Sequence, residues 1–138
     1  MSFIHVQFAP GFGYEDVVLL AMDTPGVKVV LKALKDALQG GQARFECDGV
    51  VQEFRIQAGA ADIELSDDLV VWQLDCARAV EVEEYLASFR ESDRPGHQYV
   101  DIHSPTETLV LSHDEYTRQY FEQLPGELRY AKPGESSV

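Results

Sequence analysis

The residues best suited to chemistry stand near the end of the chain, where Ser112, His113 and Asp114 have the side chains of a hydrolase triad. In such a triad an acid orients a histidine, and the histidine takes the proton of a nucleophilic hydroxyl. Three consecutive residues cannot place their side chains in that relay, and the sequence has no GxSxG turn to present a serine. We therefore predict no catalytic residues and a protein that is not an enzyme.

A second group, His97, Asp101 and His103, has the residue types of a zinc site. Alternation along an extended strand would place all three side chains on one face. The sequence supplies no identifiable further ligand. The glycines on either side of Phe12 lack the third glycine and the following helix of a dinucleotide-binding loop. We predict neither a metal ion nor a cofactor.

The net charge limits the kinds of partner. The 138 residues include 24 acidic and 11 basic ones, which gives a formal net charge of -13. Such a charge disfavours nucleic acid and anionic membrane surfaces and favours a basic protein partner. Residues 1 to 45 contain equal numbers of acids and bases, so the whole acidic excess lies after them. The bias could also serve solubility alone, and this alternative stays open.

Two consecutive hairpins between Gln42 and Asp75 are the clearest structural signal in the chain. Asp48-Gly49 favours a two-residue turn, which pairs Cys47 with Val50 and Phe45 with Gln52. A turn at Asp67-Asp68 gives the second hairpin. The alternation then predicts four large side chains buried on one side beneath the helices, namely Phe45, Phe54, Ile63 and Trp72.

Acidic residues fall on the other side of these hairpins. Arg44 lies opposite Glu53 in the predicted register, as a cross-strand ion pair. A second helix adds further acids to the surface. We predict that the partner is bound by acids of the outer sheet face and of this helix, namely Glu46, Glu53, Asp62, Glu64, Glu81 and Glu84.

Helical periodicity and end signals predict the elements around the hairpins. The first helix runs from Thr24 as its cap, with Pro25 in the first position, to Gly40. Asp75 caps a second helix. The remaining expected elements are the helix of residues 76–92, the strands of residues 3–8, 17–22, 98–102 and 109–112, and a short helix of residues 113–124.

The order of these elements predicts an α+β fold, ββαββββαββ, in which six to eight strands form a mainly antiparallel sheet with two helices packed on one face. Residues 1–124 are expected to form a single domain and residues 125–138 a loose tail. A loose ββα periodicity is visible, but residue identity does not mark it as a repeat. No signal peptide or apolar run of membrane-spanning length is found, which favours the cytoplasm.

The segment Gly96–Tyr116 (GHQYVDIHSPTETLVLSHDEY) combines an aromatic-and-aspartate strand, a Leu/Val strand and a Ser-x-Asp/Glu-Tyr end. In these features it resembles the carboxy-terminal strand pair of a group of small acidic bacterial proteins, the immunity proteins of polymorphic toxin systems. The resemblance implies a non-enzymatic protein that binds and neutralises a cognate toxin domain. It assigns no functional residues.

Two other classes of function remain open from the sequence. A small enzyme or ligand-binding domain would need a cavity between sheet and helices, gated by the loop of Phe12 and Tyr14. A structural subunit would need no site at all. The oligomeric state is not indicated.

Overall fold

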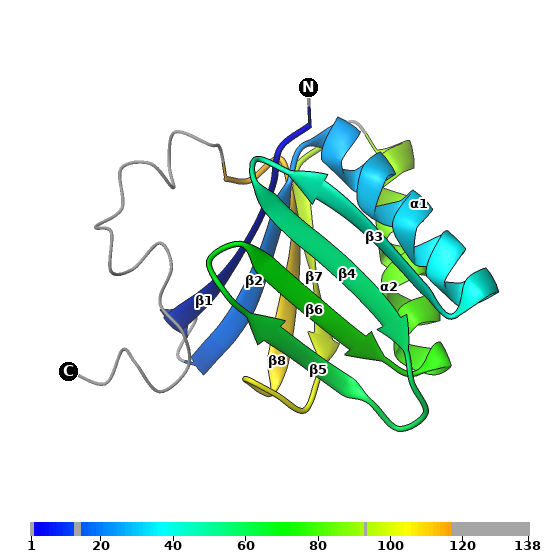
Figure 1. The fold of residues 1–138 in the computed structure, drawn as a ribbon. Coiled ribbons are helices and arrows are strands. Elements are labelled where there is room, and N and C mark those ends of the chain that lie inside the picture. Colours follow the sequence, from blue (N-terminus) through cyan, green and yellow to red (C-terminus); the bar gives the residue numbers. More distant parts are fainter. Residues whose placement is uncertain (1, 13–14, 93, 117–138) are drawn as a thin grey trace.

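Eight strands and two helices make up the computed structural model, which describes residues 2–12, 15–92 and 94–116 (Figure 1). Their order along the chain is the predicted one, and the α+β class is confirmed. The elements are β1 (Ile4–Phe12), β2 (Glu15–Met22), α1 (Thr24–Gly40), β3 (Gln42–Cys47), β4 (Val50–Ile56), β5 (Ala61–Leu65), β6 (Leu69–Leu74), α2 (Cys76–Glu91), β7 (Gly96–Asp101) and β8 (Thr108–His113).

The strands form two sheets, so the prediction of a single sheet was wrong, and both sheets are mixed instead of purely antiparallel. Sheet A has the order β1-β2-β8-β7, and sheet B has the order β3-β4-β6-β5. Each of the four hairpins is antiparallel, with the registers predicted for β3–β4 and β5–β6. The central pairs, β2–β8 and β4–β6, are parallel. Parallel strands need long connections, so a sequence pattern that detects hairpins does not show which hairpins become neighbours.

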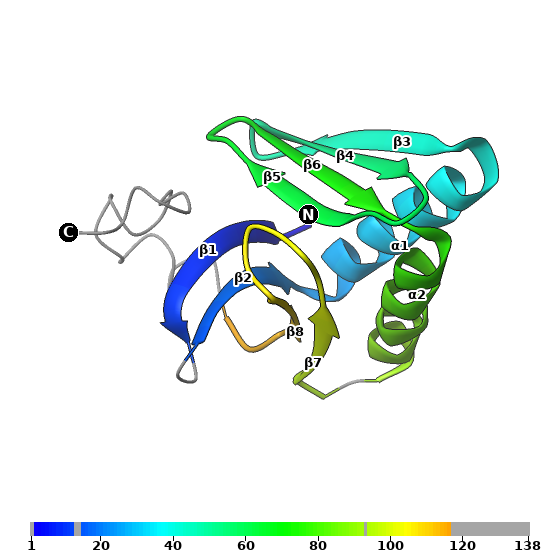
Figure 2. The same ribbon diagram turned by 90° about the horizontal axis from the view of Figure 1, so that it is seen from below.

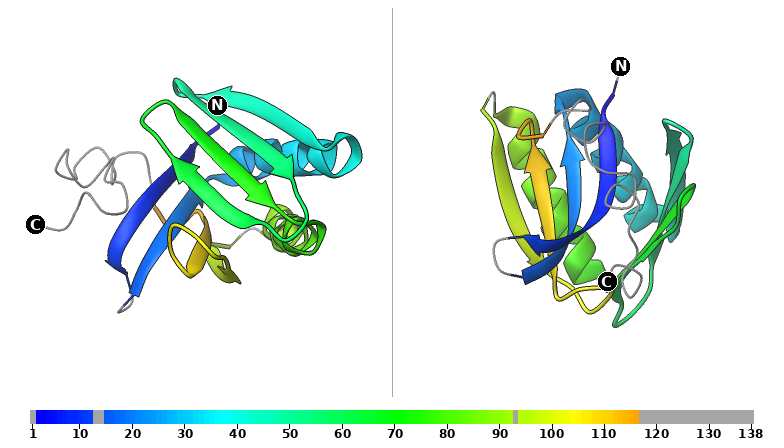
Figure 3. Two further views of the ribbon diagram at one scale, coloured as in Figure 1. Left: turned by 60° about the horizontal axis from the view of Figure 1, so that its bottom comes forward. Right: turned by 90° about the vertical axis from the view of Figure 1, so that its left-hand side faces the viewer.

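The two sheets face each other, and both helices lie together at one side of the space between them (Figures 2 and 3). The helices therefore pack on the inner surfaces of two sheets, not on one face of a single sheet. On the other side, β5 bonds to the β7–β8 loop. Ile63 N–H donates to the carbonyl of Ser104, and His103 N–H donates to the carbonyl of Ala61. These bonds join sheet B to the connection between two strands of sheet A.

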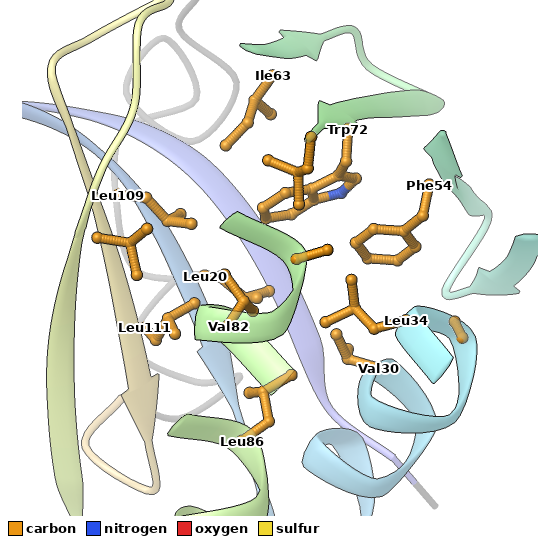
Figure 4. Close-up of a cluster of buried hydrophobic side chains, with 14 of the residues drawn as sticks. Leu20, Val30, Leu34, Phe54, Ile63, Trp72, Val82, Leu86, Leu109 and Leu111 are labelled. Carbon is orange, nitrogen blue, oxygen red and sulfur yellow. The ribbon is translucent and has the colours of Figure 1, made fainter. Parts of the chain in front are cut away.

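One apolar core fills the space between the sheets and the helices (Figure 4). Trp72 at its centre stacks on Phe54 at 5.3 Å, and its indole N–H donates to the buried Gln52 Oε1 at 2.9 Å. Leu34 of α1 and Leu86 of α2 are also fully buried here. Of the four side chains predicted to be buried, Phe54, Ile63 and Trp72 are, whereas Phe45 on the edge strand β3 is only half-buried.

Both helices begin at an aspartate cap. Asp23 Oδ1 accepts the N–H of Gly26 at 2.7 Å, and Asp75 Oδ1 accepts the N–H of Arg78 at 2.7 Å. The second cap was predicted. The cap of the first helix was predicted at Thr24, one residue too late. Thr24 can also cap a helix, and Pro25 is tolerated at either of the first two helical positions.

The described part of the chain consists of two topologically equivalent halves. Each half reads ββαββ, and each gives one hairpin to sheet A and one to sheet B. Equivalent backbone bonds join the halves, from Asp114 N–H to the carbonyl of Met22 and from Gln57 N–H to the carbonyl of Leu74. The sequence shows little of this, because few equivalent positions keep their residue. Identical pairs in the second strand, the helix cap and the helix of each half are Val18/Val70, Asp23/Asp75, Val30/Val82 and Leu34/Leu86.

Sheet A is apolar on its second face as well. Val17, Leu19, Ala21 and Val110 are buried on the face turned away from the helices, and Tyr116 packs against them. The nearly continuous apolar sequence of β2 is typical of a strand covered on both sides.

The end of the described chain differs from the sequence prediction. Strand β8 continues through His113, and residues 114–116 are not helical, so the short helix does not begin where it was predicted. The rest of that helix, residues 117–124, and the predicted tail, residues 125–138, lie outside the described residues. Neither α1 nor α2 has the length and apolar character needed to cross a membrane.

Candidate binding surface

The outer face of sheet B carries the predicted acids in rows across the strands. In one row, Arg44, Glu53, Val71 and Glu64 are successive neighbours on β3, β4, β6 and β5. Rows on either side contain Asp62 and Glu46. The alternation therefore placed Glu46, Glu53, Asp62 and Glu64 on the correct face.

Glu53 lies between two arginines. Arg44 reaches one carboxylate oxygen at 4.0 Å, as predicted, and Arg55 donates to the other oxygen. The side chain of Glu53 is only 15% exposed. The two arginines therefore balance the charge of Glu53 within the sheet. Glu53 is less available to a binding partner than its place on the outer face suggests.

Asp62 and Glu64 lie on β5, the edge strand joined to the β7–β8 loop. Asp62 Oδ1 accepts the hydroxyl of Ser104 at 2.7 Å, so this carboxylate helps to hold the loop. Glu64 is exposed. Of these two acids, Glu64 is the one accessible to a partner.

The predicted helix acids lie on a different surface. Helix α2 packs against α1, β6 and β7 on the inner side of the two sheets, so its exposed side points away from the outer face of sheet B (Figure 2). Glu81 is half-buried beside Arg78, whose Nη1 is 3.5 Å from its carboxylate, and Glu84 is exposed. One flat partner surface cannot contact both predicted groups.

Four acids gather at the end of sheet B where both of its hairpins turn. Because β4 and β6 are parallel, the two turns lie side by side, and Val51 N–H donates to the carbonyl of Asp68 at 2.9 Å. Half-buried Val51 and Leu69 lie next to each other on the outer face. We call the exposed acids of this end the acidic turn patch, which consists of Glu46, Asp48, Asp67 and Asp68.

Sequence reasoning included only Glu46 from this patch. Asp48, Asp67 and Asp68 were interpreted as turn residues, which they are. Their proximity depends on the parallel β4–β6 pairing, and no local pattern encodes that pairing. The sequence feature that could have indicated the acidic turn patch is that both hairpin turns contain aspartate.

The triad residues do not form a relay. Ser112 points to the outer face of sheet A, and His113 points into the core. The Nε2 atom of His113 contacts both Thr24 Oγ1, at 2.8 Å, and Asp114 Oδ2, at 3.2 Å. A relay needs the acid and the hydroxyl on opposite ring nitrogens. This geometry does not transfer a proton from a nucleophile.

The histidines and acids of the β7 region do not converge on a metal site. His97 and Asp101 share a face of β7, but His103 lies beyond its end. His97 Nδ1 instead contacts Glu115 Oε2 at 2.9 Å. Within residues 2–12, 15–92 and 94–116, no three His, Cys, Asp or Glu side chains are grouped closely enough to hold a metal ion.

Comparison with known proteins finds a similar fold but no matching family. No protein-family model matches the chain, and no curated protein matches it. Its fold is similar to part of Drosophila Suppressor of Fused. The match to that crystal structure has a TM-score of 0.50 at 11% identity and covers 82% of this chain and 26% of that one. The chain thus spans about a quarter of the protein it matches, and at this identity the likeness concerns the fold alone.

A cleft of about 240 Å³ lies where the β1–β2 hairpin approaches the β7–β8 loop. Its lining is acidic, and it is open to solvent. It does not lie between sheet and helices, where the core side chains pack. The lining residues are Glu15, Asp16, Pro105, Thr106 and Glu107.

Proposed function

We propose that this chain is a non-enzymatic protein-binding module of the cytoplasm, and that its acidic turn patch docks on a basic surface of another protein. The observation that carries the proposal is the meeting of two acidic turns beside Val51 and Leu69. Apolar centres with polar, charged rims are typical of protein–protein contacts.

The charge of the whole chain supports the same kind of partner. A net charge of -13 attracts a basic protein over a distance and raises its rate of encounter. The patch then provides an oriented contact. Glu53 and Asp62 are engaged within the protein and contribute less than the exposed Glu46 and Glu64.

The sequence resemblance to immunity proteins suggests which basic protein to test first. A toxin domain encoded beside this chain would be the partner, and binding would neutralise it. Co-expression with the neighbouring gene product should then restore growth to cells in which that product alone is toxic.

The direct test is capture from lysate of the native organism with the purified chain at low and high salt. A basic protein should be retained at low salt and released at high salt, because salt screens the attraction. A variant without the patch charges should retain roughly tenfold less of it. That variant is Glu46→Gln, Asp48→Asn, Asp67→Asn, Asp68→Asn.

A matched control removes four acids from α2. It should retain the partner nearly as well as the natural chain, since α2 lies on another surface. Equal loss in both variants would mean that net charge alone is responsible, and absence of any basic protein at low salt would contradict the proposal. The control variant is Glu81→Gln, Glu83→Gln, Glu84→Gln, Glu91→Gln.

A further inference from the structure

Strand β7 is, with β1, one of the two edge strands of sheet A. Among the described strands it pairs with β8 and with no other, and its second edge lies at the side of the molecule (Figure 3, right). Three of its side chains, His97, Gln98 and Tyr99, are exposed in succession, and Tyr99 is 55% exposed.

The backbone groups that face this open edge follow from the register. Ile102 N–H donates to the carbonyl of Glu107 at 3.0 Å, and this bond continues the β7–β8 ladder. In an antiparallel ladder every second residue bonds the neighbouring strand, and the residues between them point their N–H and C=O groups outward. The outward residues are therefore His97, Tyr99 and Asp101.

Two of the other three sheet edges are blocked. Strand β1 has an irregular register between Ala9 and Phe12 and contains Pro10, and both features hinder strand addition. Strand β5 is already bonded to residues 103–104. Strand β7 has neither a proline nor a bulge in its paired residues.

We propose that a second copy of this chain pairs with the first along β7, antiparallel, about a two-fold axis at Tyr99. In this register Tyr99 lies opposite Tyr99 of the second copy, and His97 lies opposite its Asp101. Each opposed pair exchanges two backbone hydrogen bonds, and the two A sheets become one continuous sheet.

The side chains on the outer face suit this register. Opposed aromatic residues and opposed His and Asp side chains are favourable cross-strand pairs. Glu115 engages Nδ1 of His97, so Nε2 is the nitrogen left for Asp101 of the second copy. An edge-to-face contact between the rings of His97 and Tyr99, whose centroids are 5.4 Å apart, further fixes the position of His97.

The third edge, β3, gives an instructive contrast. The bond from Ile56 N–H to the carbonyl of Gly41 makes Gln42, Arg44 and Glu46 its outward residues. The same symmetric pairing centred there would oppose Arg44 to Arg44, which is destabilising. Complementary residues thus favour self-association at β7, and like charges oppose it at β3.

Light scattering during gel filtration, over a range of protein concentrations at moderate salt, tests the dimer. The natural chain should pass from monomer to dimer mass as concentration rises. Tyr99→Pro should stay monomeric at every concentration, because it removes an outward N–H and leaves the β7–β8 bonds intact. Tyr99→Lys, which opposes two like charges on the axis, is the second variant should the proline prevent folding.

The control is Glu46→Lys on the β3 edge, which should dimerise like the natural chain. A chain that stays monomeric up to its solubility limit would overturn the proposal. A dimer that survives both Tyr99→Pro and Tyr99→Lys would place the contact elsewhere and overturn it as well.

A disulfide cross-link tests the register. In a chain with Cys47→Ser and Cys76→Ser, Tyr99→Cys should give a covalent dimer under mild oxidation, because directly opposed bonded residues have Cα atoms about 5.5 Å apart. Gln98→Cys should give none, since residue 98 lies opposite residue 100 of the second copy. Equal cross-linking at both positions would contradict the register.

Discussion

His113 is a polar side chain enclosed by the apolar core. It is fully buried, its ring stacks on Phe89 at 5.5 Å, and its Nδ1 atom finds no hydrogen-bond partner within the described residues. The equivalent position in the other half is the half-buried Ile56, which pairs with Leu74 as His113 pairs with Met22. The fold thus accepts an aliphatic side chain at such a position.

Two substitutions of His113 should therefore behave differently. His113→Leu should change the free energy of unfolding by less than about 1 kcal/mol, since it removes an unsatisfied polar atom and fills similar space. His113→Ala should cost about 2–4 kcal/mol, because it leaves a cavity beside Phe89. Urea denaturation measures both. If leucine costs as much as alanine, the contacts to Thr24 and Asp114 are needed for stability.

At the scale of elements, two glycines of α1 have opposite roles. A Cβ atom at Gly26 would lie 2.3 Å from the backbone oxygen of Phe3, whereas one at Gly40 would meet nothing within 4 Å. Gly26→Ala should destabilise by more than about 1 kcal/mol despite the better helix propensity of alanine. Gly40→Ala should stabilise by about 0.5–1 kcal/mol. Thermal unfolding of the pair checks this, and a stabilising Gly26→Ala would contradict the close packing of α1 on β1.

Local patterns predicted the elements and left their arrangement undetermined. The hairpin registers and the buried stripes of both helices follow from periods that each segment carries by itself. The parallel β2–β8 and β4–β6 pairs join segments far apart in the sequence, so they were missed. The same long-range pairing explains why the acidic turn patch was not predicted. Outer-face acids such as Glu64 were found by alternation, but the grouping of Asp48 with Asp68 required the parallel pairing.

At the scale of the whole molecule, the two halves hold each other through both sheets and through the paired helices. A protease site inserted in the exposed loop of residues 57–59 would cut between them. The cut chain should still elute as one particle in gel filtration, because the β2–β8 and β4–β6 ladders and the common core remain. The same insertion left uncut is the control. Separation of the two fragments without denaturant would show that the ladders need a continuous chain.

The parallel pair at the centre of sheet A also affects how the protein is made. The apolar strand β2 is synthesised early, but its neighbour β8 is the last of the described strands. Until Thr108–His113 has left the ribosome, one edge of Val17–Met22 has no strand beside it from this chain. Exposed apolar edges of this kind promote aggregation and are held by chaperones during synthesis. A nascent chain that stops before Thr108 would present its most apolar strand to other chains on the same messenger RNA.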